Sequence, residues 1–358
     1  MPLPKFLIPM SKVYPVVLLL NDIHISKDNI PEFSANWHEA LALCEKMNIP
    51  DIAFGGDMFL SRSAQTLDVL LAVHDALLEA GKRNIHVTLI NGNHDKVNQE
   101  AIRGYCHVFD QHSNVLVVDD YYTLLSSEQW EFALHLIPYF PENNTFVERL
   151  NTLIKNGLDK KRANFLYIHE GINGALQHPS EKELPPTIFH DFDKVFVGHY
   201  HNRCKVDTRV EYIGSSRQNN FGEDEAKGYT IINADGSTSF IKNKVNTRYK
   251  VMDVSAENVN TNLTDELDEI KADGRYLVKV RIHSTSTGIT GIDKENLLAA
   301  GANKVEIVTE NTEELDIQDS ALFDKYDSFK IKENYQRFCK EKEIENVTLG
   351  LSYLSKIK

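Results

Sequence analysis

Short apolar runs alternate with longer amphipathic stretches over residues 13–243. The predicted strands are VVLLLN, IAFGG, IHVTLING, FALHLIPY, ANFLYIHE, KVFVGHY and VEYIGS. Apolar residues at helical spacing over residues 36–47 and 64–79 predict two helices between the first three strands. Strands that alternate with helices are typical of an α/β domain built in layers, so we expect sheets flanked by helices.

A smaller α+β pattern follows residue 243. Its predicted strands are RYKVMDV, RYLVKVRIHS and KVEIVT, and its predicted helices are NLTDELDEIKADG and DKENLLAAGA. The last segment is rich in Phe, Tyr, Leu and Lys and is predicted to be helical. We therefore expect three parts: a main domain over residues 1–243, a small α+β domain over 244–319 and a helical tail over 320–358.

The composition limits the class of protein. A chain of 358 residues with 42% hydrophobic and 25% charged residues has the size for two domains and the balance of a globular protein. The longest apolar run near the N-terminus, residues 16–20, is much shorter than the ~20 residues that span a bilayer, and no signal-peptide pattern precedes it. The four cysteines have no CxxC spacing, which argues against a disulfide framework and a zinc ribbon. We therefore expect a soluble cytoplasmic protein with no membrane partner.

Most of the predicted strands end at a polar cluster with chemically capable side chains. The clusters NDIH, GGDMF, NGNHD, IHEG and GHYH supply Asp22, His24, Asp57, Asn93, His169, His199 and His201. In layered α/β sheets, ligands bind beyond one common edge of the strands, where such loops converge. Imidazole, carboxylate and amide ligands without a thiolate suit manganese, iron or zinc rather than calcium. Two divalent ions held in this way bind a phosphate between them, so the sequence predicts a two-metal phosphoesterase.

This ordered series resembles the blocks of the calcineurin-like metallophosphoesterase superfamily: D-x-H, G-D, G-N-H-D/E, a lone His, and G-H-x-H. The resemblance implies a layered sandwich of mixed sheets flanked by helices, with two metal sites. By position, the first metal would be held by Asp22, His24, Asp57 and His201, and the second by Asp57, Asn93, His169 and His199. His94 is similar to the non-ligand histidine that stabilises or protonates the leaving oxygen, and Asp95 to its orienting partner.

Two further stretches, LIPYF and YIGSSRQNNFGEDEAKGYTIIN, resemble blocks of SbcD-type DNA double-strand-break repair nucleases and their phage relatives. This resemblance implies two manganese ions, DNA as substrate, and residues 244–319 as a capping domain that helps to bind DNA. It also implies a homodimer, through helices between residues 36 and 81 or near Arg103, in the cytoplasm of the cell or of a phage host. The tail over residues 320–358 either docks on the coiled coil of an SbcC-type ATPase partner or packs on its own domain.

Arg62 and Arg217 are candidate substrate-binding residues. One position departs from the family pattern, because Leu60 stands where many relatives carry a histidine or aspartate shortly after GDxF. Ser61 or Arg62 is the candidate to take over any accessory role of that side chain in exonuclease activity.

Three functions are open at this point. The leading hypothesis is a manganese-dependent DNA exonuclease and endonuclease subunit of a double-strand-break repair or recombination complex. The net charge of −13 does not exclude DNA as a partner, because DNA binding depends on the local electrostatic potential. The second is a small-molecule phosphodiesterase or phosphatase that acts on nucleotides, which the extra α+β segment disfavours. The third is a binding subunit or scaffold without catalysis, which is disfavoured because every ligand position holds a competent residue.

Overall fold

The computed structural model describes residues 13–124, 127–141, 145–176, 183–256, 263–284, 294–309, 335–336, 339–340 and 347–354. The chain divides into two compact units, Met1–Ile282 with Asp293–Glu306 and His283–Ile292 with Ile307–Lys358. The domain borders expected after residues 243 and 319 remain a prediction, and most of the predicted helical tail lies outside the described residues. Among the described residues, no helix has the length and apolar character needed to cross a membrane.

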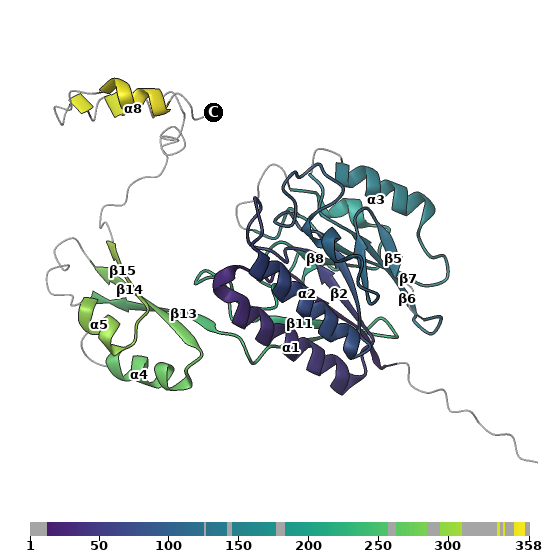
Figure 1. Cartoon of the computed structure of the whole chain (residues 1–358), viewed down its shortest axis with the longest axis horizontal. Coiled ribbons are helices and arrows are strands. Elements are labelled where there is room, and N and C mark those ends of the chain that lie inside the picture. Colours follow the sequence, from purple (N-terminus) through teal and green to yellow (C-terminus); the bar gives the residue numbers. More distant parts are fainter. Residues whose placement is uncertain are drawn as a thin grey trace, which may run out of the picture. The chain divides into compact units, whose positions relative to one another are not determined.

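Two six-stranded sheets form the centre of the first unit (Figure 1). The first sheet has the order β12-β11-β1-β2-β3-β4 and the second the order β5-β6-β7-β8-β10-β9. The strands of the first are β1 (Pro15–Leu20), β2 (Asp51–Gly55), β3 (His86–Ile90), β4 (Val115–Val118), β11 (Gly228–Asn233) and β12 (Thr238–Lys242). Those of the second are β5 (Tyr122–Leu124), β6 (Phe132–Ile137), β7 (Ala163–His169), β8 (Lys194–Gly198), β9 (Cys204–Lys205) and β10 (Val210–Tyr212).

The strands at the centre of each sheet are parallel. Strand β2 pairs in parallel with both β1 and β3 in the first sheet, and β7 pairs in parallel with both β6 and β8 in the second. Their carboxyl ends therefore meet at one edge of each sheet. Tyr167 of β7 ties the two sheets together near this edge, because its hydroxyl donates to the Leu20 carbonyl at the end of β1, 3.0 Å away.

Alternate residues of strand β1 pack into two different hydrophobic cores, one on each face of the first sheet. Leu18 and Leu20 of β1 lie in the core beneath helices α1 (Ile30–Met47) and α2 (Leu67–Lys82), whereas Val17 and Leu19 lie in the core between the two sheets. Helix α3 (Thr145–Asn156) covers the outer face of the second sheet (Figure 1). The succession helix, sheet, sheet, helix confirms the predicted layered α/β class.

Helices α1 and α2 begin at other residues than predicted, and a third helix was not predicted. Helix α1 begins at Ile30, six residues before the predicted start, with a proline in its first turn, where proline is tolerated. Helix α3 was not predicted, although Phe146, Leu150 and Leu153 stand at helical spacing and are buried. Three short 3-10 helices, Lys27–Asn29, Tyr105–Phe109 and Pro186–Phe189, complete the connections among the described residues of this domain.

A separate three-stranded sheet, here called the appended sheet, has the order β13-β14-β15. It is made of β13 (Arg248–Ser255), β14 (Tyr276–Ser284) and β15 (Lys304–Thr309), with helices α4 (Leu263–Asp273) and α5 (Lys294–Ala300) between them; helix α8 (Val347–Leu354) follows. Val278, Val280 and Ile282 are buried at alternate positions of β14, the pattern of a strand with one covered face. The alternation of strands and helices predicted after residue 243 is therefore present.

Candidate metal centre

The loops at the carboxyl ends of five strands supply the predicted metal-site residues. Two residues follow β1, one follows β2, one follows β3, one ends β7 and two follow β8; in that order they are Asp22, His24, Asp57, Asn93, His169, His199 and His201. Because the first and second sheets face each other, strand ends from both sheets converge, and the structure brings all seven side chains together.

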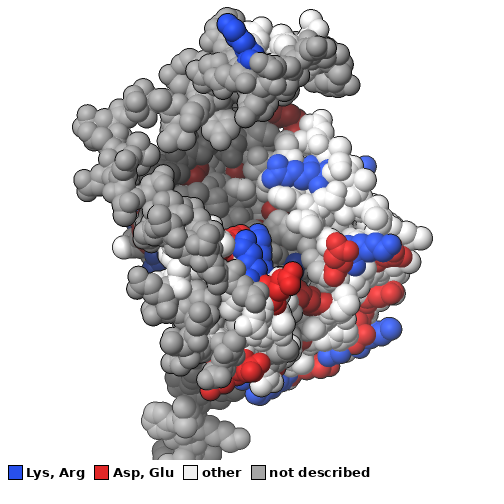
Figure 2. Space-filling view, turned by 90° about the vertical axis from the view of Figure 1, so that its left-hand side faces the viewer, with Lys and Arg blue, Asp and Glu red and all other residues white. Residues whose placement is uncertain are grey.

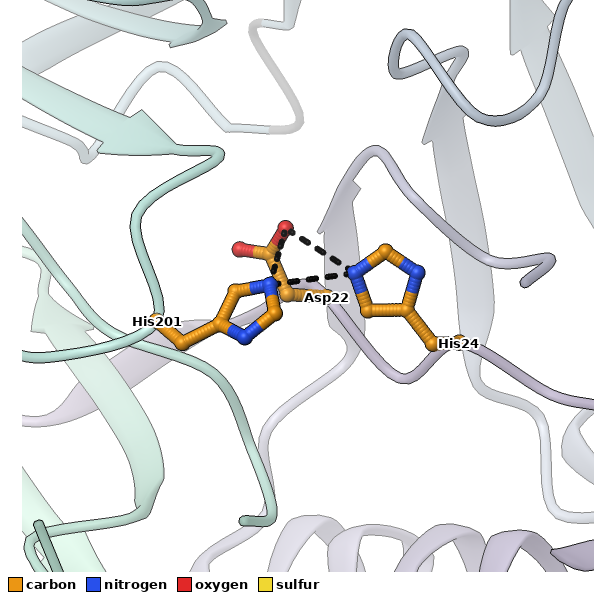
Figure 3. A group of neighbouring side chains, drawn as sticks. All are labelled: Asp22, His24 and His201. Atoms are coloured by element: carbon orange, nitrogen blue, oxygen red, sulfur yellow. Dashed lines mark hydrogen bonds and ion pairs between the residues drawn. The ribbon is translucent and has the colours of Figure 1, made fainter. Parts of the chain in front are cut away.

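The first group consists of Asp22, His24 and His201, whose ligand atoms all lie within 4.8 Å of one another. Figure 3 shows the two imidazoles pointing toward each other with the carboxylate beside them. The Nε2 atoms of His24 and His201 are 3.1 Å apart, and Asp22 Oδ1 is 3.9 Å from each. Three electron-pair donors that converge in this way suit a cation at their centre.

The second group consists of Asp57, Asn93, His169 and His199. His169 Nε2 lies 3.3 Å from Asp57 Oδ2, and Asn93 Oδ1 lies 3.2 Å from both His169 Nε2 and His199 Nδ1. Asp57 Oδ2 is also 3.6 Å from His24 Nε2 of the first group. Asp57 therefore stands between the groups, the place that a bridging carboxylate requires.

The backbone at these ligands is unusual. Asp22, His24, Asp57 and His199 have φ angles of 54°, 52°, 55° and 96°, in the left-handed region that residues other than glycine rarely adopt. Such strain is concentrated at functional sites, where the surrounding structure holds it. Gly92 is also required, because a Cβ atom there would lie 2.2 Å from Asp57 Oδ1.

Burial and charge set the protonation of the groups. Burial lowers the pKa of His24 to about 4, and burial together with His169 lowers that of His199 to about 4. Burial would also lower the pKa of His169, but the Asp57 carboxylate raises it to about 10. In turn, His169 overcomes the effect of burial and holds the pKa of Asp57 well below its usual range. The neutral imidazoles of His24 and His199, beside a carboxylate that draws positive charge, are donors that fit divalent metal ions.

Neighbouring acceptors fix the orientation of two ligand imidazoles. His169 Nδ1 lies 2.8 Å from the Gly55 carbonyl, and His201 Nδ1 lies 2.7 Å from Glu223 Oε1. A proton on each Nδ1 leaves Nε2 free to face the cluster, the arrangement that commonly supports metal-binding histidines. Glu223 was not predicted as a site residue, although it lies in the FGEDEAKG stretch that carries part of the resemblance to nuclease blocks.

His94 lies beside both groups, but its expected orienting partner is replaced. Its backbone N–H donates to Asp57 Oδ1 (2.8 Å), and its Nδ1 lies 2.7 Å from the Leu60 carbonyl. Asp95, predicted to orient His94, is fully buried and accepts hydrogen bonds from the amides of Phe59 (3.0 Å) and Gly92 (2.8 Å). The Asp95 carboxylate therefore joins the loop after β2 to the loop after β3, because the buried amides of Phe59 and Gly92 need an acceptor. The His94 imidazole meets the Leu60 carbonyl instead. Burial and then Asp57 raise the pKa of Asp95 to about 7.

The two arginines marked as substrate-binding candidates occupy different environments. Arg62 is exposed, and its guanidinium lies beside the Asn93 side-chain amide at the edge of the second group. Arg217 is 4% exposed, donates from Nε to the Ile23 carbonyl (2.9 Å) and pairs with Glu32 (2.9 Å). The structure thus brings Arg62 to the cluster, whereas Arg217 supports the loop between Asp22 and His24 from inside.

A cavity of about 430 Å³ borders the cluster on the side of His199 and His201. Tyr200, Asn202 and Glu223 also line it. A substrate that places its phosphate at the metal groups therefore has space for an adjoining part in this cavity.

Known proteins similar in sequence to this chain include two putative phosphoesterases and a nuclease component. No protein-family model matches the chain. It is 23% identical over 220 residues to putative phosphoesterase 244L of Invertebrate iridescent virus 6, across 60% of this chain and 75% of that protein. It is 24% identical over 248 residues to the SbcD component of nuclease SbcCD from Staphylococcus saprophyticus, and 26% identical over 216 residues to putative phosphoesterase 078R of Invertebrate iridescent virus 3. These matches cover 56% and 58% of this chain, but only 64% and 59% of the two relatives, which is less than two thirds of either.

Among solved structures, the nuclease MPE of Pseudomonas putida aligns with a TM-score of 0.28 at 18% sequence identity, across 61% of this chain and 84% of that one.

Proposed function

Because the chain is a calcineurin-like metallophosphoesterase that resembles the SbcD component of the SbcCD nuclease, we propose that it is a DNA exonuclease and endonuclease subunit for double-strand-break repair or recombination. The observation that carries this proposal is the pair of metal-ligand groups that share the Asp57 carboxylate. Phosphodiester hydrolysis by two metals needs this arrangement.

We assign one divalent ion to each group, with manganese as the proposed metal. The first group (Asp22, His24 and His201) and the second group (Asp57, Asn93, His169 and His199) would hold them, with Asp57 shared. When bound, the two ions polarise the phosphate and lower the pKa of an attacking water.

We assign His94 the role of general acid toward the leaving oxygen. Its Nδ1 is engaged by the Leu60 carbonyl, which leaves Nε2 for proton transfer. Its ring packs edge-on against His24, with centroids 4.7 Å apart, so it stands beside the metal groups without being required as a ligand. Residue 60 therefore positions the acid through its main-chain carbonyl, a contact that does not depend on which side chain stands there, so the departure at Leu60 leaves it intact.

We assign Arg62 to contact with a DNA phosphate, because it is an exposed cation beside the second group. On the face drawn in Figure 2, Lys and Arg side chains are interspersed with Asp and Glu side chains over the described surface. Binding of the DNA phosphates would therefore depend on the metal ions and on individual cations, and less on a continuous basic stripe. Arg217 is proposed to position the Asp22–His24 loop.

Two partners belong to the same proposal. Leu67, Leu71 and Leu78 are 68%, 48% and 42% exposed on one side of α2, which supports the proposed homodimer through residues 36–81. An SbcC-type ATPase partner and a cytoplasmic location rest on the resemblance to the SbcD component.

The cavity beside His199 and His201 favours one alternative, a phosphodiesterase that acts on small nucleotides. The two functions are separated by incubating the purified chain and Mn²⁺ with end-labelled duplex DNA, single-stranded DNA and bis-p-nitrophenyl phosphate. We expect degradation of DNA, with activity lost in Asp57→Ala and lowered ~10²- to 10⁴-fold in His94→Gln, which keeps its metal. Intact DNA together with rapid hydrolysis of the small diester would contradict the nuclease assignment and leave the metal site standing.

A further inference from the structure

The loop between β10 and β11 contacts the metal cluster through several side chains. We call residues 215–227 of this loop the strap. Glu223 Oε1 lies 2.7 Å from Nδ1 of His201, and Lys227 Nζ donates to the carbonyl of the same histidine (2.6 Å). Asn219 Nδ2 donates to the Asp22 carbonyl (3.1 Å). Two of the three residues of the first group are therefore held by the strap.

The same strap also contacts the appended sheet. The Gln218 side chain pairs with the main chain of Tyr249 in β13, accepting from its amide (3.0 Å) and donating to its carbonyl (3.1 Å). The Phe221 ring meets the Tyr249 ring edge-on, with centroids 5.1 Å apart, and Lys279 Nζ of β14 lies 5.2 Å from the Phe221 centroid. The Gln218 side chain thus makes with Tyr249 of β13 a pair of hydrogen bonds to the main-chain amide and carbonyl of one residue.

Gln218 is the point at which these two sets of contacts join. Besides its two bonds to Tyr249, its Nε2 donates to the Glu223 carbonyl (3.0 Å), and the side chain is fully buried. Gln218 therefore bonds to the main chains of both Tyr249 and Glu223, and the Glu223 carboxylate in turn meets His201, a series of contacts that links β13 to the first group. Buried amides that lose such partners are left unsatisfied at a substantial cost, so the series favours one fixed arrangement.

We propose that the strap couples the seating of β13 to the affinity of the first group for its metal ion, with Gln218 and Glu223 as positioning residues. This proposal rests on the proposed function only in requiring that the first group binds a metal. Glu223 fixes the His201 ring, and partners of this kind commonly change metal affinity by roughly 10- to 100-fold. The coupling is reciprocal, so metal binding at the first group also stabilises the contact of the strap with β13.

The first measurement is Mn²⁺ binding by calorimetry, with electron paramagnetic resonance to follow each ion. Gln218→Leu keeps the side-chain volume and removes all three hydrogen bonds. We expect it to lower the affinity for one of the two Mn²⁺ ions by about tenfold and to leave the affinity for the other unchanged. Glu223→Ala should weaken the same ion more than Glu223→Gln, because a glutamine oxygen still accepts from His201. Arg209→Gln is the control, since this exposed residue next to β10 lies outside the strap and the appended sheet, and both ions should bind as in the parent chain.

The second measurement uses the unaltered chain, so it does not depend on whether a variant folds. Hydrogen exchange of the β13 amides should slow when Mn²⁺ is added, and Glu223→Ala should reduce this protection. The coupling would be overturned if folded Gln218→Leu bound both ions with the affinity of the parent chain, or if Mn²⁺ did not change hydrogen exchange in β13. Either result would leave the metal assignment in place. A parent chain that binds no metal would overturn the metal assignment together with the coupling.

Discussion

The two metal groups differ in what holds their histidines. In the second group, His169 is completely buried and its Nδ1 meets a main-chain carbonyl, that of Gly55 at the end of β2. In the first group, the His201 side chain is 24% exposed and its Nδ1 meets the carboxylate of Glu223 in the strap. A main-chain acceptor within a sheet is fixed by the fold itself, whereas a loop side chain can move or be replaced. At these two histidines, the second group is the preformed half of the centre and the first group the adjustable half.

Asp57 is shared by the two groups, so its substitution should have the largest effect on both. Asp57→Asn keeps the shape of the side chain but removes the charge that faces both His24 and His169. We expect both ions to be lost at micromolar Mn²⁺ and phosphodiesterase activity to fall by ~10³-fold or more. Metal content after gel filtration and a turnover assay check this result. If one ion stayed bound with unchanged affinity, Asp57 would not bridge the groups.

His169 and His201 should contribute differently to stability in the absence of metal. His169→Ala leaves the buried Asp57 carboxylate without its close partner, so in metal-free buffer we expect the free energy of unfolding to fall by about 3 kcal/mol. His201→Ala removes a partly exposed ring, and the expected loss is about 1 kcal/mol or less. Urea unfolding of both variants measures the difference. Equal losses would show that the two groups are held with similar rigidity.

The convergence of the candidate metal-site residues could be predicted because each stands at or directly after the end of an apolar strand. Parallel strands place their carboxyl ends at one edge, so the clusters NDIH, GGDMF and NGNHD had to converge, as did IHEG and GHYH. The meeting of the two sets could not be read from any spacing, because it depends on how the two sheets pack through residues such as Tyr167. The resemblance to known blocks supplied that step.

The supporting contacts were harder to predict for a physical reason. A buried carboxylate is satisfied equally well by an imidazole or by backbone amides, and sequence does not say which lies nearer. The Asp95 carboxylate was therefore expected beside His94 but meets the Phe59 and Gly92 amides. Glu223 lies in an irregular segment without periodicity, so no pattern aimed it at His201.

Protonation offers a smaller but precise test of the second group. Asp57 raises the pKa of His169 to about 10, so this imidazole carries a proton at neutral pH until a metal ion takes its place. Metal binding should then release about one proton from His169, and affinity should rise with pH, by at most about tenfold per unit, up to pH 10. Calorimetry in two buffers with different ionisation enthalpies counts the proton. Binding heats that do not depend on the buffer would contradict this assignment, and His169→Ala is the control that should release one proton fewer.

Arg62 provides the smallest expected effect, because it lies outside both groups and is exposed to solvent. If its guanidinium contacts a DNA phosphate beside the second group, Arg62→Ala should raise KM by about 3- to 10-fold and leave kcat nearly unchanged. The rise should shrink as salt screens the contact. Arg209→Ala, at an exposed arginine next to β10, is the matched control and should leave KM unchanged. A lower kcat in Arg62→Ala at unchanged KM would instead mean that the guanidinium acts on the transition state through Asn93, which would extend the preformed half of the centre to the surface.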